Sequence, residues 1–207
     1  MVKIGVLISG NGSNLQAIID GIDKGLIKGK IEIIISNNKD AYGLVRGKNS
    51  NIKSLFMDPK GYDPISYDRK LLYELKKSKV DLVVLAGYLK ILSKEFIDQY
   101  KNRIINIHPS LIPSFCGKGY YGDRVHKAVL DYGVKYTGAT AHFVDEGTDT
   151  GPIILQEIVA VDDGDTVKTL KEKVLQAEHK ILVQAVKLFC DSKISIEERI
   201  VRIIDKE

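Results

Sequence analysis

The sequence IINIHPSLIP, at Ile104–Pro113, is an apolar run that ends in a proline-flanked loop and indicates a buried strand. The β-branched isoleucines suit a central strand. Pro109 has no N–H to donate to a neighbouring strand, so the strand is expected to end there. Side chains two apart on a strand share a face, which places Asn106 and His108 together at the carboxyl end of this strand.

An amide and an imidazole side by side at a strand end suit acyl-group chemistry. The Asn106 amide can stabilise a developing oxyanion, and the His108 imidazole can move protons near neutral pH. The alternative is structural, with His108 bonded to a turn carbonyl and Asn106 capping the following loop. For an isolated N-x-H-P motif the structural interpretation is the commoner one, so other parts of the chain must decide.

Composition limits the possible classes of protein. The 207 residues suit one large domain, or a domain with a small appendage, and 44% hydrophobic residues are enough for a sizeable core. A net charge of +4 mildly favours anionic ligands. The lysines are scattered as on solvated helix faces, without interleaved aromatic residues, so we expect no nucleic-acid partner.

Cysteine usage and hydropathy bear on location. Cys116 and Cys190 show no metal or redox spacing, so we expect a reducing, cytoplasmic environment. The first strand follows the initial Met almost directly, without a recognisable signal peptide. No apolar run approaches membrane-spanning length, so we expect no membrane association.

Strand-like and helix-like patterns alternate along the chain. Apolar runs predict strands at 3–8, 31–35, 52–56, 81–86, from 104, at 140–144 and at 152–161. Apolar residues at helical spacing predict helices after residue 14, at 41–48, from 64, from 93, at 125–131 and at 165–190. The alternation predicts an α/β fold, with a Rossmann-like, mostly parallel, twisted sheet and helices on both faces. Ligands of such sheets bind at the carboxyl ends of the strands, so we expect the ends of the strands at 3–8, 81–86 and from 104 to line one cleft. We expect one domain over residues 1–190 and a C-terminal tail over 191–207, either a hairpin or a frayed helix.

The loop after the first strand, residues 9–14 (SGNGSN), is similar to the glycine loop of dinucleotide-binding folds. Leu15 replaces the third glycine of that motif and the second strand ends without an acidic residue, which disfavours a nicotinamide or flavin. The loop still suits a phosphate, because glycines admit a close approach and a helix start supplies free N–H groups. The alternative is a tight turn in which Ser13 or Asn14 caps the helix, and the residues leave both open.

An acidic, glycine-flanked loop within 142–152 joins two late strands. Its Asp149 is useful if the loop folds over His108, because a neighbouring carboxylate favours a charged imidazolium. The alternative is a solvated acidic loop. Glu178, in the last helix, has the spacing of a surface carboxylate paired with a nearby lysine. The histidines lack zinc-ligand spacing, so we expect no metal.

Four motifs occur in an order that resembles one family: SGNGSNLQAI at 9–18, LAGYLKIL at 85–92, NIHPSL at 106–111, and HFV with a following DTGP between 142 and 152. Together they resemble the phosphoribosylglycinamide formyltransferases, folate-dependent enzymes of purine synthesis, over residues 3 to about 190. The NIHPSL motif belongs to the wider formyltransferase superfamily, whereas GNGSN looks specific for glycinamide ribonucleotide. The resemblance implies a formyltransferase fold and transfer of the formyl group of 10-formyltetrahydrofolate to the amine of glycinamide ribonucleotide, without a metal.

The resemblance also implies residue roles. The implied catalytic residues are Asn106, His108 and Asp149. The implied substrate-binding residues are Gly12, Ser13 and Asn14, which would hold the phosphate, and Glu178. The implied folate-binding residues, acting largely through backbone groups, are Leu89, Lys90, Ile91, Leu92 and Asn106.

The chain departs from the family pattern in few places. Pro64 stands where the family often has an arginine reaching the folate, and Leu89-Lys90 replaces the commoner Met-Arg. Cys116 stands where proline is usual, and as a nucleophile it would lack an orienting group. The resemblance also implies a cis peptide bond before Pro113.

Three other functions were weighed. A methionyl-tRNA formyltransferase would need a further nucleic-acid-binding domain, for which 207 residues leave no room. A formyltetrahydrofolate hydrolase typically carries an additional N-terminal regulatory domain. A non-catalytic nucleotide-binding module has no use for the Asn106, His108 and Asp149 set. We expect small-molecule substrates as the only ligands of a monomer or homodimer.

Overall fold

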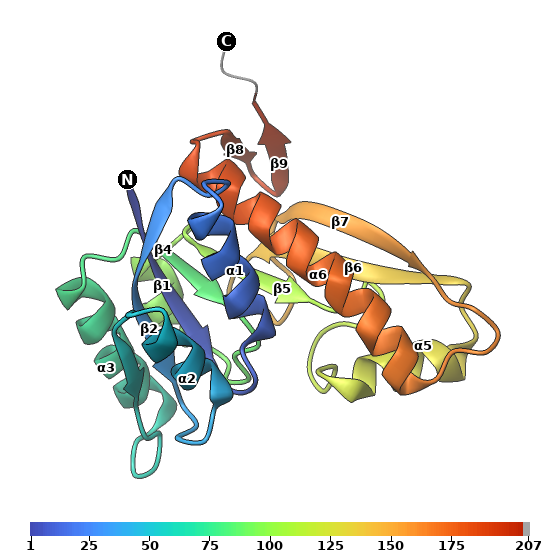
Figure 1. The fold of residues 1–207 in the computed structure, drawn as a ribbon, viewed down its shortest axis with the longest axis horizontal. Helices are drawn as coiled ribbons and strands as arrows, with labels where there is room; N and C mark the ends of the chain where they lie inside the picture. Colours follow the sequence, from blue (N-terminus) through green and yellow to red (C-terminus); the bar gives the residue numbers. More distant parts are fainter. Residues whose placement is uncertain (205–207) are drawn as a thin grey trace.

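A seven-stranded sheet in the order β3-β2-β1-β4-β5-β6-β7 forms the centre of the fold (Figure 1). The computed structural model describes residues 1–204. The strands of the sheet are β1 (Val2–Ile8), β2 (Gly29–Ser36), β3 (Ser54–Phe56), β4 (Leu82–Leu85), β5 (Ile104–His108), β6 (Tyr136–Phe143) and β7 (Ile153–Ala160). Strands β1 to β5 pair in parallel, whereas β6 runs antiparallel to both β5 and β7. The predicted, mostly parallel sheet is confirmed.

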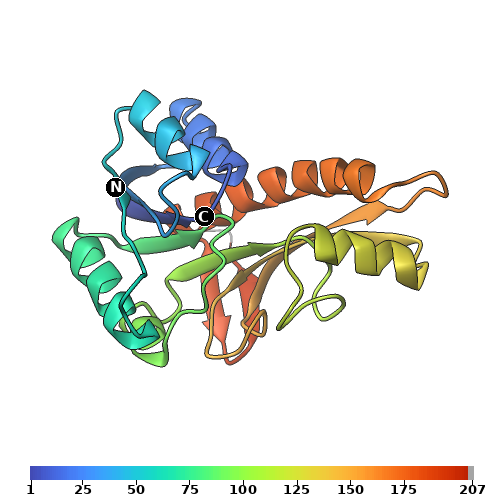
Figure 2. The same cartoon turned by 90° about the horizontal axis from the view of Figure 1, so that it is seen from below.

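Helices cover both faces of the sheet, as predicted (Figure 2). They are α1 (Ser13–Asp23), α2 (Tyr42–Asn49), α3 (Pro64–Lys77), α4 (Lys94–Gln99), α5 (Asp123–Tyr132) and α6 (Val167–Cys190). Apolar residues of α1, α2 and α6 pack in one buried cluster, and those of α3 and α4 pack in another. The sheet separates the two clusters, because alternate side chains along each strand point to opposite faces.

Local sequence explains where the helices begin. Asp63 caps α3 by accepting bonds from the N–H groups of Ile65 and Ser66, and Pro64 is the first helical residue. Thr166 and Thr169 form a capping box at the start of α6.

The structure corrects three strand boundaries and settles the form of the tail. β2 begins at Gly29 instead of residue 31, β3 begins at Ser54 instead of residue 52, and β6 begins at Tyr136 instead of residue 140. The apolar pattern does not reveal the start of β6 because Gly138 interrupts it. Glycine is needed at this position, since a Cβ there would lie 2.0 Å from the Glu157 carbonyl oxygen of β7. Strands β8 (Ile194–Glu197) and β9 (Ile200–Ile203) form a two-stranded hairpin at the end of α6, and the last three residues of the expected tail lie outside the described residues.

Membrane crossing can be judged from the helices. Within residues 1–204, no helix is both long enough and apolar enough to span a bilayer.

Candidate active site

A cleft of about 590 Å³ opens at the carboxyl ends of β1, β4 and β5. Asn14 and His108 both line it, as does the loop over residues 87–92. The cleft therefore joins the expected phosphate loop to the strand end that the sequence singled out. The expectation that these strands share one cleft is confirmed.

Gly12 sets the conformation of the loop before α1. It is the N-cap of the helix, with φ 75° and no side-chain cap, so Ser13 and Asn14 lie inside the first turn. The alternative in which either of them caps the helix is wrong. A Cβ on Gly12 would lie 2.7 Å from the Cα of Gly43 in α2, so only glycine fits this contact. The first N–H groups of α1 remain available to an anion.

Arg46 of α2 holds the same loop, and the sequence analysis missed it. Its Nε and Nη2 donate to the backbone and side-chain oxygens of Asn11, both at 3.0 Å, and its Nη1 donates to Gln16 Oε1 at 3.2 Å. A lone arginine in a short helix carries no sequence signal for this role, because the contact depends on how α2 packs beside α1.

Asn14 and Glu178 meet at one side of the cleft. Asn14 Nδ2 donates to Glu178 Oε2 at 2.7 Å, and the Glu178 side chain is buried. Burial raises the pKa of Glu178 to about 7, against the opposing effects of the Asn14 bond and of Lys171. The expectation of a surface carboxylate paired with a lysine is wrong, because this face of α6 packs against α1.

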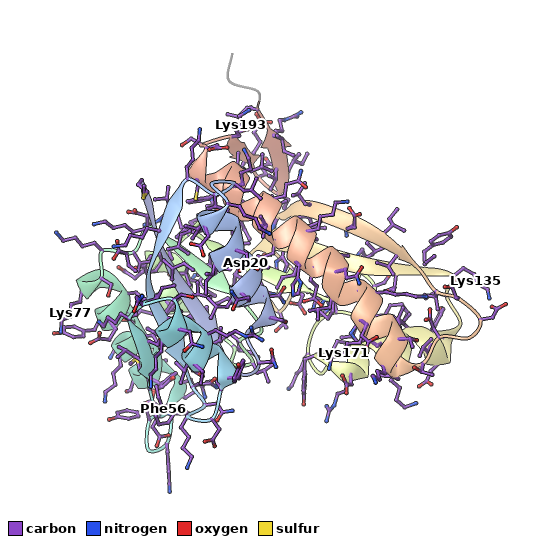
Figure 3. The ribbon with its side chains drawn as sticks, in the orientation of Figure 1. Asp20, Phe56, Lys77, Lys135, Lys171 and Lys193 are labelled. Atoms are coloured by element: carbon purple, nitrogen blue, oxygen red, sulfur yellow. The ribbon has the colours of Figure 1, made fainter. Side chains whose placement is uncertain are left out.

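Lys171 also lines the cleft. It projects from the N-terminal half of α6 (labelled in Figure 3) and donates to Asp123 Oδ1 at the start of α5 at 2.7 Å. Both Lys171 and the buried His126 of α5 line the cleft. Burial lowers the pKa of His126 to about 4, so this ring is neutral at physiological pH.

The structure brings Asn106, His108 and Asp149 together. His108 Nδ1 lies 3.5 Å from Asp149 Oδ2, and Asn106 Nδ2 lies 3.5 Å from Asp149 Oδ1. The Gly117 N–H donates to Asp149 Oδ2 at 2.9 Å and holds the carboxylate in place. Asp149 therefore folds over the end of β5, and the alternative of a solvated acidic loop is wrong for this residue.

The structural alternative for the strand end is partly right. His108 Nε2 bonds to the Phe115 carbonyl oxygen at 3.0 Å, which is a loop carbonyl of the kind expected. A carbonyl oxygen therefore faces one ring nitrogen of His108 and a carboxylate oxygen faces the other. Asn106 does not cap the following loop, since its amide faces His142 and Asp149.

His142 orients the Asn106 amide, a role that the sequence analysis missed. Asn106 pairs with His142 across β5 and β6, and Asn106 Nδ2 lies 3.1 Å from His142 Nε2. Burial lowers the pKa of His142, so the ring is neutral. Its Nδ1–H donates to the Phe143 carbonyl oxygen at 2.8 Å, which leaves Nε2 to accept from Asn106. Only the antiparallel register of the two strands reveals this pair.

The loop after β4, residues 87–92, forms another wall of the cleft. Leu89 and Ile91 are 64% and 68% exposed there, an unusual degree for large apolar side chains that line a cleft. The loop is fixed at both ends, because Leu89 N donates to Ser9 Oγ at 2.9 Å and Ser93 N donates to Asp68 Oδ2 at 2.5 Å. Lys90 lies over the Tyr67 ring at 5.3 Å, and Leu92 is buried.

Two further expectations can be compared with the structure. The Ile112–Pro113 peptide bond is cis, as the resemblance implied. In the part of the chain from residue 1 to 204, no group of three or more His, Cys, Asp or Glu side chains is arranged to hold a metal ion.

An amide, an imidazole and a carboxylate at the strand ends of such a sheet define a class of protein. The chain belongs to the formyl transferase family, whose model matches residues 2–186. Within that class, it is 39% identical over 198 residues to the phosphoribosylglycinamide formyltransferase of Escherichia coli K12, covering 95% of this chain and 91% of the relative.

Two other similar proteins carry the same activity in their names. The chloroplastic phosphoribosylglycinamide formyltransferase of Vigna unguiculata is 40% identical over 197 residues; the match covers 93% of this chain and spans 62% of that relative's length. The crystal structure of glycinamide ribonucleotide transformylase 1 from Symbiobacterium toebii superposes with a TM-score of 0.94 at 45% identity, covering 99% of this chain and 95% of that one.

Proposed function

We propose that this protein transfers the formyl group of 10-formyltetrahydrofolate to the amine of glycinamide ribonucleotide, giving formylglycinamide ribonucleotide in de novo purine synthesis. The observation that carries the proposal is that one cleft is lined both by Asn14, in the first turn of α1, and by Asn106, His108 and Asp149. The names of the similar proteins support the same reaction.

The two ends of the cleft suit the two substrates. Gly12, Ser13 and Asn14 would hold the ribonucleotide phosphate on the N–H groups at the start of α1. Glu178 would accept hydrogen bonds from the ribonucleotide, since Asn14 already orients its carboxyl group. At the other end, Leu89, Lys90, Ile91 and Leu92, with Asn106, would bind the folate through backbone groups and an apolar surface. Pro64, the first residue of α3, offers the folate no side-chain cation. Lys90, whose ammonium group lies over the Tyr67 ring, carries a positive charge in this loop.

Direct transfer needs no covalent enzyme intermediate and no metal. The uncharged amine attacks the formyl carbon, and negative charge develops on the formyl oxygen. The Asn106 amide and protonated His108 stabilise that charge. Asp149 stabilises the charged ring and holds a water. Through this water and His108, a proton moves from the nitrogen that attacked to the folate nitrogen, whose bond to the formyl carbon then breaks. His142 keeps the Asn106 amide group turned to donate.

The rest of the proposal concerns organisation and surroundings. Residues 1–190 act as the formyltransferase domain and the tail takes no part in the reaction. The ligands are the two small-molecule substrates, with no nucleic acid or membrane, and the chain acts as a monomer or homodimer. The free Cys116 and Cys190 support a cytoplasmic location.

There are two alternatives. One is a formyltetrahydrofolate hydrolase, which would pass the formyl group to water. The other, from a different class, is a non-catalytic nucleotide-binding module. Release of tetrahydrofolate from 10-formyltetrahydrofolate, followed with and without glycinamide ribonucleotide, separates all three. The proposal expects release only with the ribonucleotide. Equal release without it would identify a hydrolase, and no release under either condition would leave a binding module.

A further inference from the structure

The loop between β5 and α5 touches the catalytic set at two points. The Phe115 carbonyl oxygen lies 3.0 Å from His108 Nε2, and the Gly117 N–H donates to Asp149 Oδ2 at 2.9 Å. Residues 115–117 therefore contact both members of the His108–Asp149 pair from one short piece of backbone. A shift of this segment would move both groups together.

The backbone of Phe115 is held in a conformation that its own chemistry disfavours. Its φ is 49°, in the left-handed region, where a residue with a Cβ is strained. That conformation aims the carbonyl oxygen at His108, and Ser110 Oγ donates to the same oxygen at 3.3 Å. Such a conformation persists only where surrounding contacts impose it.

The ring of Phe115 supplies those contacts. It meets Tyr132, the last residue of α5, edge to face at 5.8 Å between centroids and 79° between planes. It meets Tyr120 at 6.5 Å and 65°, and it packs against the main buried cluster. Edge-to-face pairs are attractive and directional, so they fix the ring and, through it, the backbone.

We propose that Tyr132 is a positioning residue for catalysis, and this rests on the proposed function. By packing on Phe115 it holds residues 115–117 so that the Phe115 carbonyl and the Gly117 N–H fix His108 and Asp149. Tyr132 does not line the cleft, so its effect on the reaction would be indirect. Its side chain is 79% exposed, so replacing it leaves no cavity in the core.

The experiment compares three variants of the full chain. Tyr132→Leu removes the ring, and Tyr132→Phe keeps it. Tyr136→Leu is a matched control, since Tyr136 is 65% exposed in β6 and its ring stacks on no other aromatic ring within residues 1–204. None of these changes alters the titratable groups near His108, which are Asp149, His126 of α5 and His142 of β6.

We expect Tyr132→Leu to lower kcat about tenfold with KM for both substrates nearly unchanged, because small misplacements of catalytic groups cost rate more than binding. Tyr132→Phe and Tyr136→Leu should retain the kcat of the unaltered protein. In ¹⁵N-histidine NMR spectra without substrates, the His108 ring signals should move in Tyr132→Leu and stay in place in the other two variants.

A lower melting temperature in Tyr132→Leu with unmoved His108 signals would overturn the proposal, since it shows a merely structural role. Moved signals with unchanged kcat would overturn it as well. The NMR comparison does not need turnover. If the unaltered protein transfers no formyl group, the proposed function fails. Unmoved His108 signals in Tyr132→Leu overturn the positioning role of Tyr132, whether or not the protein transfers a formyl group.

Discussion

Asn14 and Glu178 lie 164 positions apart in the chain, yet Asn14 Nδ2 donates to Glu178 Oε2 at 2.7 Å. The bond joins the first turn of α1 to the middle of α6 and closes one side of the cleft. It also places a carboxyl group in a buried position, where burial raises the pKa to about 7. An acid with a raised pKa in the folded protein destabilises that protein once its proton is lost.

The first prediction concerns stability and Glu178. From its ordinary pKa of 4.5 up to about 7, the folded protein keeps a proton that the unfolded chain releases, so stability falls as the pH rises through this window. Glu178→Gln removes the ionisation and keeps an oxygen for Asn14. It should raise the free energy of unfolding by roughly 3 kcal/mol at pH 8, at 1.36 kcal/mol per pKa unit, and by little at pH 4.5.

Denaturant unfolding at both pH values measures this difference. The KM for glycinamide ribonucleotide should rise about tenfold or more in the same variant, because an amide replaces a charged acceptor. An equal gain in stability at both pH values would mean that ionisation of Glu178 is not the cause.

The second prediction concerns the loop before α1. Gly12→Ala places a Cβ 2.7 Å from Gly43 Cα at a φ of 75°, so the loop must move away from α2. The KM for the ribonucleotide should rise at least tenfold, because the N–H groups that would hold the phosphate move with the loop. Gly10→Ala is the matched control, since its Cβ would meet nothing within 4 Å. Steady-state kinetics with each substrate varied in turn measures both KM values. An equal rise in the KM for 10-formyltetrahydrofolate would contradict the assignment.

The third prediction separates two carboxylates of one loop. Asp149→Asn keeps the size of the side chain and removes the charge 3.5 Å from His108 Nδ1, so kcat should fall on the order of 10²–10⁴-fold. Both KM values should change less. Asp145→Asn should leave kcat within about threefold, because Asp145 bonds to Gly147 N and Thr150 Oγ1, which an amide oxygen also satisfies. The reverse ranking of kcat would show that the wrong carboxylate was chosen.

The fourth prediction concerns the 87–92 loop, which we propose binds the folate. Asp68 is buried and accepts from Ser93 N at 2.5 Å, which fixes the end of the 87–92 loop. Asp68→Ala should raise the KM for 10-formyltetrahydrofolate while that for the ribonucleotide stays nearly constant. It should also lower the free energy of unfolding by about 1–3 kcal/mol, because the Ser93 N–H loses its partner. Asp98→Ala, at an exposed aspartate of α4, is the control, and a comparable folate effect there would rule out this explanation.

The polar pattern of the chain predicted which strand ends meet, but not every element boundary. The β-branched run before Pro109 and the alternation of strands with helices were enough for the sheet and its two helical layers. The start of β6 was missed because Gly138 interrupts the apolar pattern at the point where β7 approaches closely. Glycine at such a contact looks like a turn in the sequence.

The sheet, the cleft at its strand ends and the proximity of Asn106 to His108 could be predicted from the amino-acid sequence, because these depend on local periodicity and on chain order. Three contacts are visible only in the folded chain: Asn14 with Glu178, His142 with Asn106, and Phe115 with His108. Those contacts depend on helix packing, strand register and one left-handed backbone angle. None of these leaves a periodic trace in a single sequence, because each joins residues whose spacing along the chain is arbitrary.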